Sequence, residues 1–119
     1  MTFYKISTTL YLDKLTECYK TIVIINTSPD GPLKKHVKSV SRNKLSPFEG
    51  DNFCSNKPSC YNVLYNLNGN NDLLCIEEIV DLFNFLSLNG YTIDNTLSKI
   101  FNKNNKLNNN ENFICMIKY

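Results

Sequence analysis

The sequence predicts an α+β fold with a small, mainly antiparallel sheet and two helices of the C-terminal half packed on one face of it. Three observations support this prediction. β-branched and apolar runs occur near both ends of the chain, apolar residues recur at helical spacing over 72–103, and Gly, Asn and Pro separate these segments. The expected order is strand, strand, long loop, strand, helix, helix, strand, which is typical of an α+β domain.

The N-terminal segment has the composition of two paired strands. Thr21–Ile25 is β-branched at every position and predicts a buried strand. Phe3–Leu12 mixes apolar residues with Ser and Thr, and we expect it to pair with that strand around a turn at Asp13–Glu17. A short helix over Leu10–Cys18 is the competing interpretation.

The region 27–58 contains all four prolines of the chain and is predicted to be an extended loop or arm. Ser28–Gly31 has the residues of a type I turn, because proline presets φ and aspartate bonds its own backbone. A structureless segment of this length is unusual within a compact domain. The arm is therefore either functional or contains a short element near Leu33–Val40.

The C-terminal half is expected to be organised by one helix. Tyr61–Leu67 alternates as a strand does, and Asn68–Asn71 forms a turn before the helix Asp72–Leu88. Asn71 or Asp72 is the expected N-cap, and Gly90 is the expected left-handed residue after the C-cap. Apolar residues cover so much of this helix that we expect it to be largely buried.

A shorter helix and a closing strand complete the chain. Asp94 is the expected N-cap of the second helix, whose inner face carries Leu97, Ile100 and Phe101. Asn104–Asn112 is a polar loop. Phe113–Ile117 is an apolar run that predicts the last strand.

Length and composition indicate one domain over 1–119 and no export or membrane segment. Met1–Lys20 lacks a continuous apolar stretch of the kind that a signal peptide requires. The longest aliphatic run, Ile22–Ile25, is far shorter than the roughly 20 residues of a membrane span. Five cysteines, an odd number without an export signal, are expected to be reduced thiols. We therefore expect the cytoplasm of a host cell or a virion as the location.

Residue usage points to the nucleotide composition of the source. Asparagine occurs nineteen times, Arg42 is the only arginine beside twelve lysines, and Ala, Gln and Trp are absent. Codons for Asn, Lys and Ile are AT-rich, so this pattern indicates an AT-rich genome. The stretch Phe85–Ile100, together with the closing strand that ends at Tyr119, resembles the C-terminal part of uncharacterised short proteins of AT-rich giant DNA viruses. The resemblance covers about a third of the chain. It implies a viral source and a virion or host-interaction role, with no activity.

The sequence contains no catalytic or cofactor-binding signature, and we expect neither catalytic residues nor a cofactor. Cys54 and Cys60 lie on one loop, but five residues separate them, and only Cys18 and His36 remain as further metal ligands. Zinc pairs usually have two to four intervening residues, and redox pairs favour two. Loop cysteines without a role are the favoured interpretation. His36 lies among lysines, where a solvated histidine is expected rather than a catalytic one.

A cluster of basic residues in the arm gives the candidate contact site for a partner or for phosphate: Lys34, Lys35, Lys38, Arg42 and Lys44. Clustered lysines bind phosphate in a salt-dependent way, but no aromatic residues alternate with them for base stacking. A helix-turn-helix with 94–103 as the recognition helix is a second route to nucleic acid, although its residues offer little positive charge. Nucleic acid is therefore not the favoured partner.

The charge distribution favours contacts with other protein chains. Residues 1–60 carry nine basic and five acidic groups, whereas residues 61–119 carry four and six. Such a division supports association with a second copy or a different chain. We predict a non-enzymatic interaction or assembly protein, with a viral structural component as its specific form. A nucleic-acid-binding module and a zinc- or thiol-containing protein are the alternatives.

Overall fold

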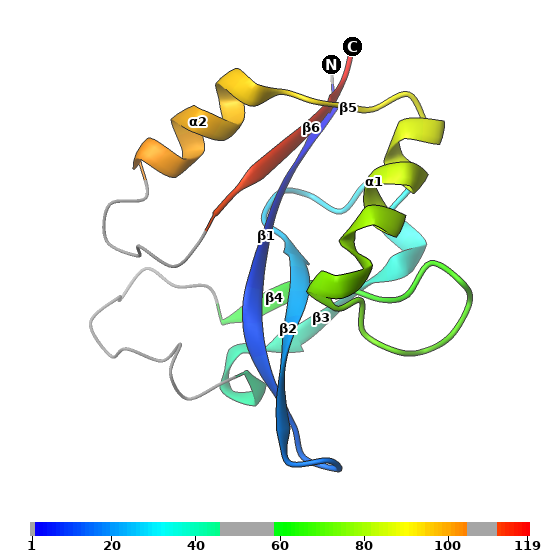
Figure 1. The fold of residues 1–119 in the computed structure, drawn as a ribbon, viewed down its shortest axis with the longest axis vertical. Coiled ribbons are helices and arrows are strands. Elements are labelled where there is room, and N and C mark those ends of the chain that lie inside the picture. The colour runs from blue at the N-terminus through cyan, green and yellow to red at the C-terminus, as the bar shows by residue number, and fades with distance from the viewer. Residues whose placement is uncertain (1, 46–58, 105–111) are drawn as a thin grey trace.

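The computed structural model describes residues 2–45, 59–104 and 112–119, which form one six-stranded antiparallel sheet with two α-helices. The strand order is β3-β4-β2-β1-β6-β5, so the first and last long strands are neighbours (Figure 1). The α+β class is therefore confirmed. The elements are β1 (Thr2–Asp13), β2 (Cys18–Ile25), η1 (Lys34–His36), β3 (Val37–Ser41), η2 (Arg42–Lys44), β4 (Cys60–Leu64), η4 (Ile76–Glu78), α1 (Ile79–Leu88), β5 (Thr92–Ile93), α2 (Asn95–Asn104) and β6 (Ile114–Lys118).

The strands β1 and β2 form a long antiparallel hairpin that projects from the body of the molecule (Figure 1). Their register runs from Ile6 opposite Ile25 to Asp13 opposite Cys18. This confirms the predicted pair of strands. The competing helix over Leu10–Cys18 is wrong, because this segment continues both strands and supplies the turn between them.

The closing strand lies between β1 and β5 rather than at an edge of the sheet. β6 pairs antiparallel with β1, from Thr2 opposite Lys118 to Ile6 opposite Ile114. The two-residue strand β5 then pairs with the other side of β6. β6 confirms the predicted strand Phe113–Ile117 with a shift of one residue. Of the loop predicted at Asn104–Asn112, residues 105–111 lie outside the described residues.

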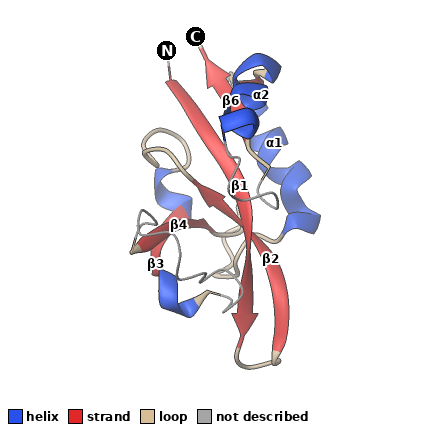
Figure 2. Cartoon of the chain, turned by 90° about the vertical axis from the view of Figure 1, so that its left-hand side faces the viewer, coloured by secondary structure: helices blue, strands red, loops and turns tan. Residues whose placement is uncertain are grey.

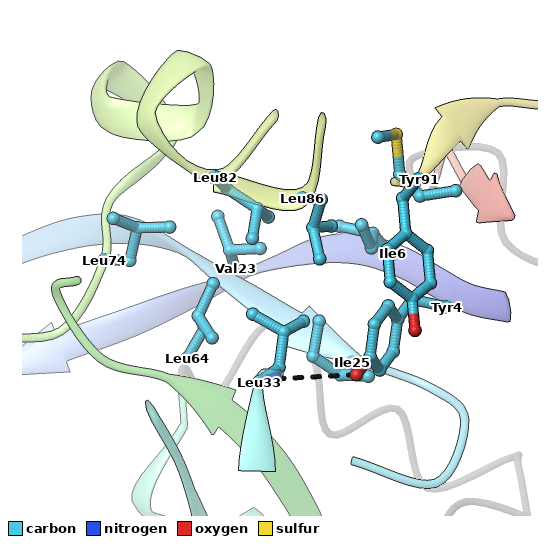
Figure 3. Packing of buried hydrophobic residues seen from close by; sticks show 11 residues of the cluster. Tyr4, Ile6, Val23, Ile25, Leu33, Leu64, Leu74, Leu82, Leu86 and Tyr91 are labelled. Atoms are coloured by element: carbon cyan, nitrogen blue, oxygen red, sulfur yellow. Dashed lines mark hydrogen bonds between the residues drawn. The ribbon is translucent and has the colours of Figure 1, made fainter. Parts of the chain in front are cut away.

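Each face of the sheet carries its own apolar cluster, because successive residues of a strand point to opposite faces. One face presents Tyr4 and Ile6 of β1 with Val23 and Ile25 of β2, and α1 covers it with Leu82 and Leu86 (Figure 3). This larger cluster consists of Tyr4, Ile6, Val23, Ile25, Leu33, Leu64, Leu74, Leu82, Leu86, Tyr91 and Met116.

The second cluster lies on the other face and holds Ile22, Ile24, Leu45, Tyr61 and Val63. Leu45, which follows η2, forms a β-bridge with Tyr11 on the far side of β1. The chain after β3 thus folds back across this face, and the sheet curls around the second cluster.

The main helix is shorter and more exposed than the sequence predicts. α1 begins at Ile79, after the 3-10 turn η4, and not at Asp72. The residue at the N-cap position is Glu78, whose side chain does not cap the helix. Residues 73–75 are extended instead, since the Leu74 N–H donates to Leu64 and the Leu74 carbonyl accepts from Val23.

The burial of α1 also differs from the expectation. Leu82 and Leu86 are fully buried, but Val80 is 60% exposed and Leu88 is 88% exposed. The expectation of a largely buried helix is therefore wrong. α1 is an amphipathic helix that packs on the sheet with one side.

The end of α1 forms as predicted. Gly90 has a φ of +87°, its N–H donates to Ser87, and the Tyr91 N–H donates to Leu86. These two bonds define a Schellman motif, which satisfies carbonyls of the last helical turn. The motif directs the chain back toward the sheet and places Tyr91 in the larger cluster.

The second helix contacts a different face from α1. Phe101 of α2 stacks on Phe3 at 6.3 Å between ring centroids, and the Lys5 ammonium lies 4.7 Å from the same ring. Phe3 and Lys5 alternate along β1 with Tyr4 and Ile6, which face α1. The helices therefore lie on either side of β1 (Figure 1), and the prediction that they share one face is wrong in this detail.

The predicted arm contains regular structure in its first half. The 3-10 turn η1 leads into β3, which pairs antiparallel with β4, and η2 follows. This confirms the alternative of a short element near Leu33–Val40. Residues 46–58 lie outside the described residues.

Candidate functional site

The strand β3 forms one outer edge of the sheet and is the candidate functional site (Figure 2). The Arg42 N–H donates to Ser59, and the Tyr65 N–H donates to His36. Alternation along an antiparallel ladder then directs the backbone groups of Lys38 and Val40 toward β4. The N–H and C=O groups of the odd-numbered residues Val37, Ser39 and Ser41 point outward, away from the sheet.

These outward groups form no hydrogen bond within the described part of the chain. They present alternating donors and acceptors along three positions of an extended backbone. Such an edge is a ready template for pairing with another extended segment.

At the opposite edge of the sheet, the two-residue strand β5 and the helix α2 together cover β6. The Asp94 N–H donates to the Cys115 carbonyl, and the Ser98 hydroxyl accepts from the Cys115 N–H at 2.8 Å. The Asn102 amide makes two bonds with the backbone of Phe113, accepting at 2.6 Å and donating at 3.1 Å. β5 thus covers β6 at Met116 and Ile117, and polar side chains of α2 replace a strand beside the rest of it. The outer strand at this edge is only two residues long, against five residues in β3.

The structure brings all five predicted contact residues to the open edge. Lys34 and Lys35 lie in η1 before β3, Lys38 lies within β3, and Arg42 and Lys44 lie in η2 after it. All five are exposed. The ion pair found among the described residues joins Lys20 to Asp13, so none of the five has a carboxylate partner there.

Two residues beside β3 have structural contacts. The His36 ring lies edge-on against Phe85 of α1, with 5.4 Å between centroids, so this histidine helps to pack η1 on α1 and is not simply solvated as expected. The Lys38 ammonium lies 4.5 Å from the centre of the Tyr65 ring. This contact holds Lys38 over the face of the sheet that carries the second cluster.

The four cysteines among the described residues differ in exposure, and two of them have a raised pKa. Cys18 and Cys60 are exposed, Cys75 is half-buried and Cys115 is buried. Burial raises the pKa of the Cys75 thiol, with Glu78 adding to the effect, and burial and Asp94 raise the pKa of Cys115. A raised pKa lowers the fraction of reactive thiolate.

No metal-binding group of three or more side chains occurs in residues 2–45, 59–104 and 112–119. The loop that carries Cys54 and Cys60 lies partly outside these residues, because Cys54 is not described.

The two helices do not form the helix-turn-helix considered from the sequence. The strand β5 separates them, and they pack on opposite faces of β1. Polar side chains of α2 are bonded within the fold instead, Ser98 to Cys115 of β6 and Asn102 to Phe113 just before it.

A cavity of about 480 Å³ lies near the start of β1, between Thr2, Tyr4, Asp30, Gly31 and Tyr91. The Tyr4 hydroxyl donates to the Asp30 carbonyl, and the Tyr91 and Thr2 hydroxyls are 3.1 Å apart. Both tyrosines are at most 4% exposed, so their polar groups bond within the protein and offer little to a ligand.

The comparisons add no functional assignment. No helix of the described chain has the length and apolar character needed to cross a membrane. No protein-family model, no curated protein and no solved structure matches this chain.

Proposed function

We propose that this chain is a non-enzymatic protein-interaction module that adds an extended segment of a partner chain to the outer side of β3. The observation that supports this proposal is the contrast between the two sheet edges. At the other edge, the short strand β5 and side-chain hydrogen bonds from α2 cover β6, whereas the backbone groups of Val37, Ser39 and Ser41 are unpaired within the described residues. Strand addition would satisfy these groups.

This proposal makes the assembly role expected from charge more specific. A virion component would use such an edge to join neighbouring chains, and a host-interaction protein would use it to hold a cellular partner. Both forms share the same chemistry at β3. The viral form rests on the resemblance of the C-terminal third alone.

Ser39→Pro is the variant that tests the proposal. The Ser39 N–H points outward, so proline removes an outward donor and leaves the ladder between β3 and β4 intact. Ser39→Ala is the matched control, because it keeps the N–H. Peptides selected from a random phage library against the wild-type chain are expected to bind Ser39→Ala normally and to bind Ser39→Pro about tenfold more weakly or not at all.

Peptide titration into the isotope-labelled wild-type chain provides a second measurement that needs no variant. The amide signals of Val37, Ser39 and Ser41 are expected to shift more than those of Lys38 and Val40. Selected peptides that bind Ser39→Pro as tightly as wild type, or that shift only signals elsewhere, would show that β3 is not the binding edge.

A further inference from the structure

We infer that the partner segment is acidic at both of its ends, with carboxylates that meet the basic residues on either side of β3. This inference rests on the proposed function and specifies its partner. It follows from where the five cations lie along the edge and from the kinds of partner that the same edge disfavours.

The cations bracket the open strand. Lys34 and Lys35 stand before its first residue, and Arg42 and Lys44 stand after its last. All four are exposed, and none has a carboxylate within ion-pair distance in the described residues. A segment paired along β3 therefore has positive charge at each end and alternating backbone groups between them. Carboxylates at both ends of the segment complement this arrangement.

The centre of the partner segment has a different requirement. Val37, Ser39 and Ser41 share one face of the sheet, while Lys38 and Val40 share the other. Val37 packs against the larger apolar cluster, and Val40 packs against the second. Neighbouring positions of an added strand would lie beside these valines, so β-branched residues suit its centre.

A second copy of the same edge does not fit. Pairing β3 with β3 of another molecule would bring both sets of cations together, and like charges that face each other across strands are destabilising. Lysine on an edge strand is a common protection against such pairing. The same residues that would oppose self-association would favour an acidic partner.

Nucleic acid fits less well than an acidic peptide. Phosphate oxygens accept hydrogen bonds, so they would leave the outward carbonyls of β3 without donors. The exposed aromatic residues of the described chain are Phe3, Tyr19 and Tyr119, which lie on β1, β2 and the chain end, away from β3. The described part of the basic edge therefore lacks fully exposed rings on which bases stack.

The test uses three labelled peptides of about ten residues, a length that spans β3 and both flanks at about 3.3 Å per residue. All three share a Thr/Val centre and carry Glu, Gln or Lys at both ends. Fluorescence anisotropy with the full chain is expected to give about tenfold tighter binding for the Glu peptide than for the Gln peptide, the size of effect expected from several weak exposed ion pairs. Raising the salt from about 50 mM to about 200 mM is expected to reduce this difference.

Charge-reversal variants locate the effect. The double variant Lys34→Glu and Lys44→Glu is expected to remove the preference for the Glu peptide. The control double variant Lys99→Glu and Lys103→Glu changes net charge equally but lies on α2, at the closed edge, and is expected to keep it.

The outcomes separate the two proposals. Equal binding of the Glu and Gln peptides, with loss of both in Ser39→Pro, would overturn the acidic partner and leave strand addition in place. Binding of the Glu peptide that Ser39→Pro leaves unchanged would overturn strand addition. A short single-stranded DNA that displaces the Glu peptide and binds more tightly than it would replace the acidic peptide with nucleic acid. Failure of all three peptides to bind would overturn both proposals.

Discussion

Gly31→Ala is expected to destabilise the fold much more than the same change at another glycine of similar backbone conformation. Gly31 has a φ of +88°, which costs an alanine about 1–2 kcal/mol. A methyl group there would also lie 2.7 Å from the Tyr4 hydroxyl oxygen. That hydroxyl donates to the Asp30 carbonyl and lies on a ring that is 2% exposed, so moving it away would break this bond and disturb a buried ring.

The steric contact with Tyr4 is expected to destabilise the fold as overpacking of a core does, by about 1–3 kcal/mol. The total for Gly31→Ala is therefore about 3 kcal/mol, a large part of the roughly 5–15 kcal/mol that stabilises a small domain. Gly69→Ala is the control, since Gly69 has a φ of +86° and nothing within 4 Å of an added methyl group. It is expected to cost about 1–2 kcal/mol, the backbone contribution alone.

Urea unfolding of the wild type and both variants measures these differences by linear extrapolation. Tyr4→Phe in the Gly31→Ala background removes the obstructing oxygen, and the two substitutions together are expected to cost less than the sum of their separate effects. Equal destabilisation by Gly31→Ala and Gly69→Ala would refute the reasoning, because the contact with Tyr4 would then contribute nothing.

Three further predictions follow from the described contacts. Asn102→Ala is expected to lower the unfolding free energy by about 1–2 kcal/mol, because both backbone groups of Phe113 lose their partner. Asn102→Asp is expected to lower it by less, because the carboxylate can still accept a hydrogen bond from the Phe113 N–H, and equal losses in urea unfolding would contradict this. Burial raises the pKa of Tyr4 to about 12, so the contribution of the protonated hydroxyl to stability is complete below pH ~10 and is lost as the pH rises toward 12. The difference in unfolding free energy between wild type and Tyr4→Phe should therefore change over this pH range, and a constant difference would exclude the effect. Iodoacetamide is expected to label exposed Cys18 and Cys60 well before Cys115, which is buried and has a raised pKa, and mass spectrometry showing early labelling of Cys115 in folded protein would be the contrary result.

The strands near the ends of the chain were predictable because their signals are local. Thr21–Ile25 is β-branched, and the alternation before it suits a paired strand, so the hairpin follows from neighbouring residues. The signal for the Gly90 cap is equally local. The order of the strands was not predictable in this way, because the pairing of β1 with β6 joins segments more than a hundred residues apart.

The start of α1 was mispredicted for a non-local reason. Leu73 and Leu74 continue the apolar spacing of the helix, and nothing in their neighbours separates them from it. The backbone groups of Leu74 are instead bonded to Leu64 and Val23, which lie on different strands. Tertiary pairing therefore overrides the helical pattern over 72–75.

The candidate site was predictable in its charges and not in its geometry. The five basic residues lie within eleven consecutive positions, 34–44, so they are close together whatever the fold. Their position beside an open edge depends on the order of all the strands. The closure of the other edge depends on Ser98 and Asn102, whose sequence context is that of ordinary polar residues on a helix.

The central pairing of β1 with β6 has a consequence for how the chain reaches its fold. Residues 2–6 pair with residues 114–118, so the sheet cannot be completed until almost the whole polypeptide has been synthesised. The β1–β2 hairpin can form early, because its strands are adjacent in sequence. During synthesis one side of β1 is then left without its neighbour, a state in which unpaired strands tend to aggregate. Folding of this protein is expected to be slow for its length, with formation of the β1–β6 pair as a late step.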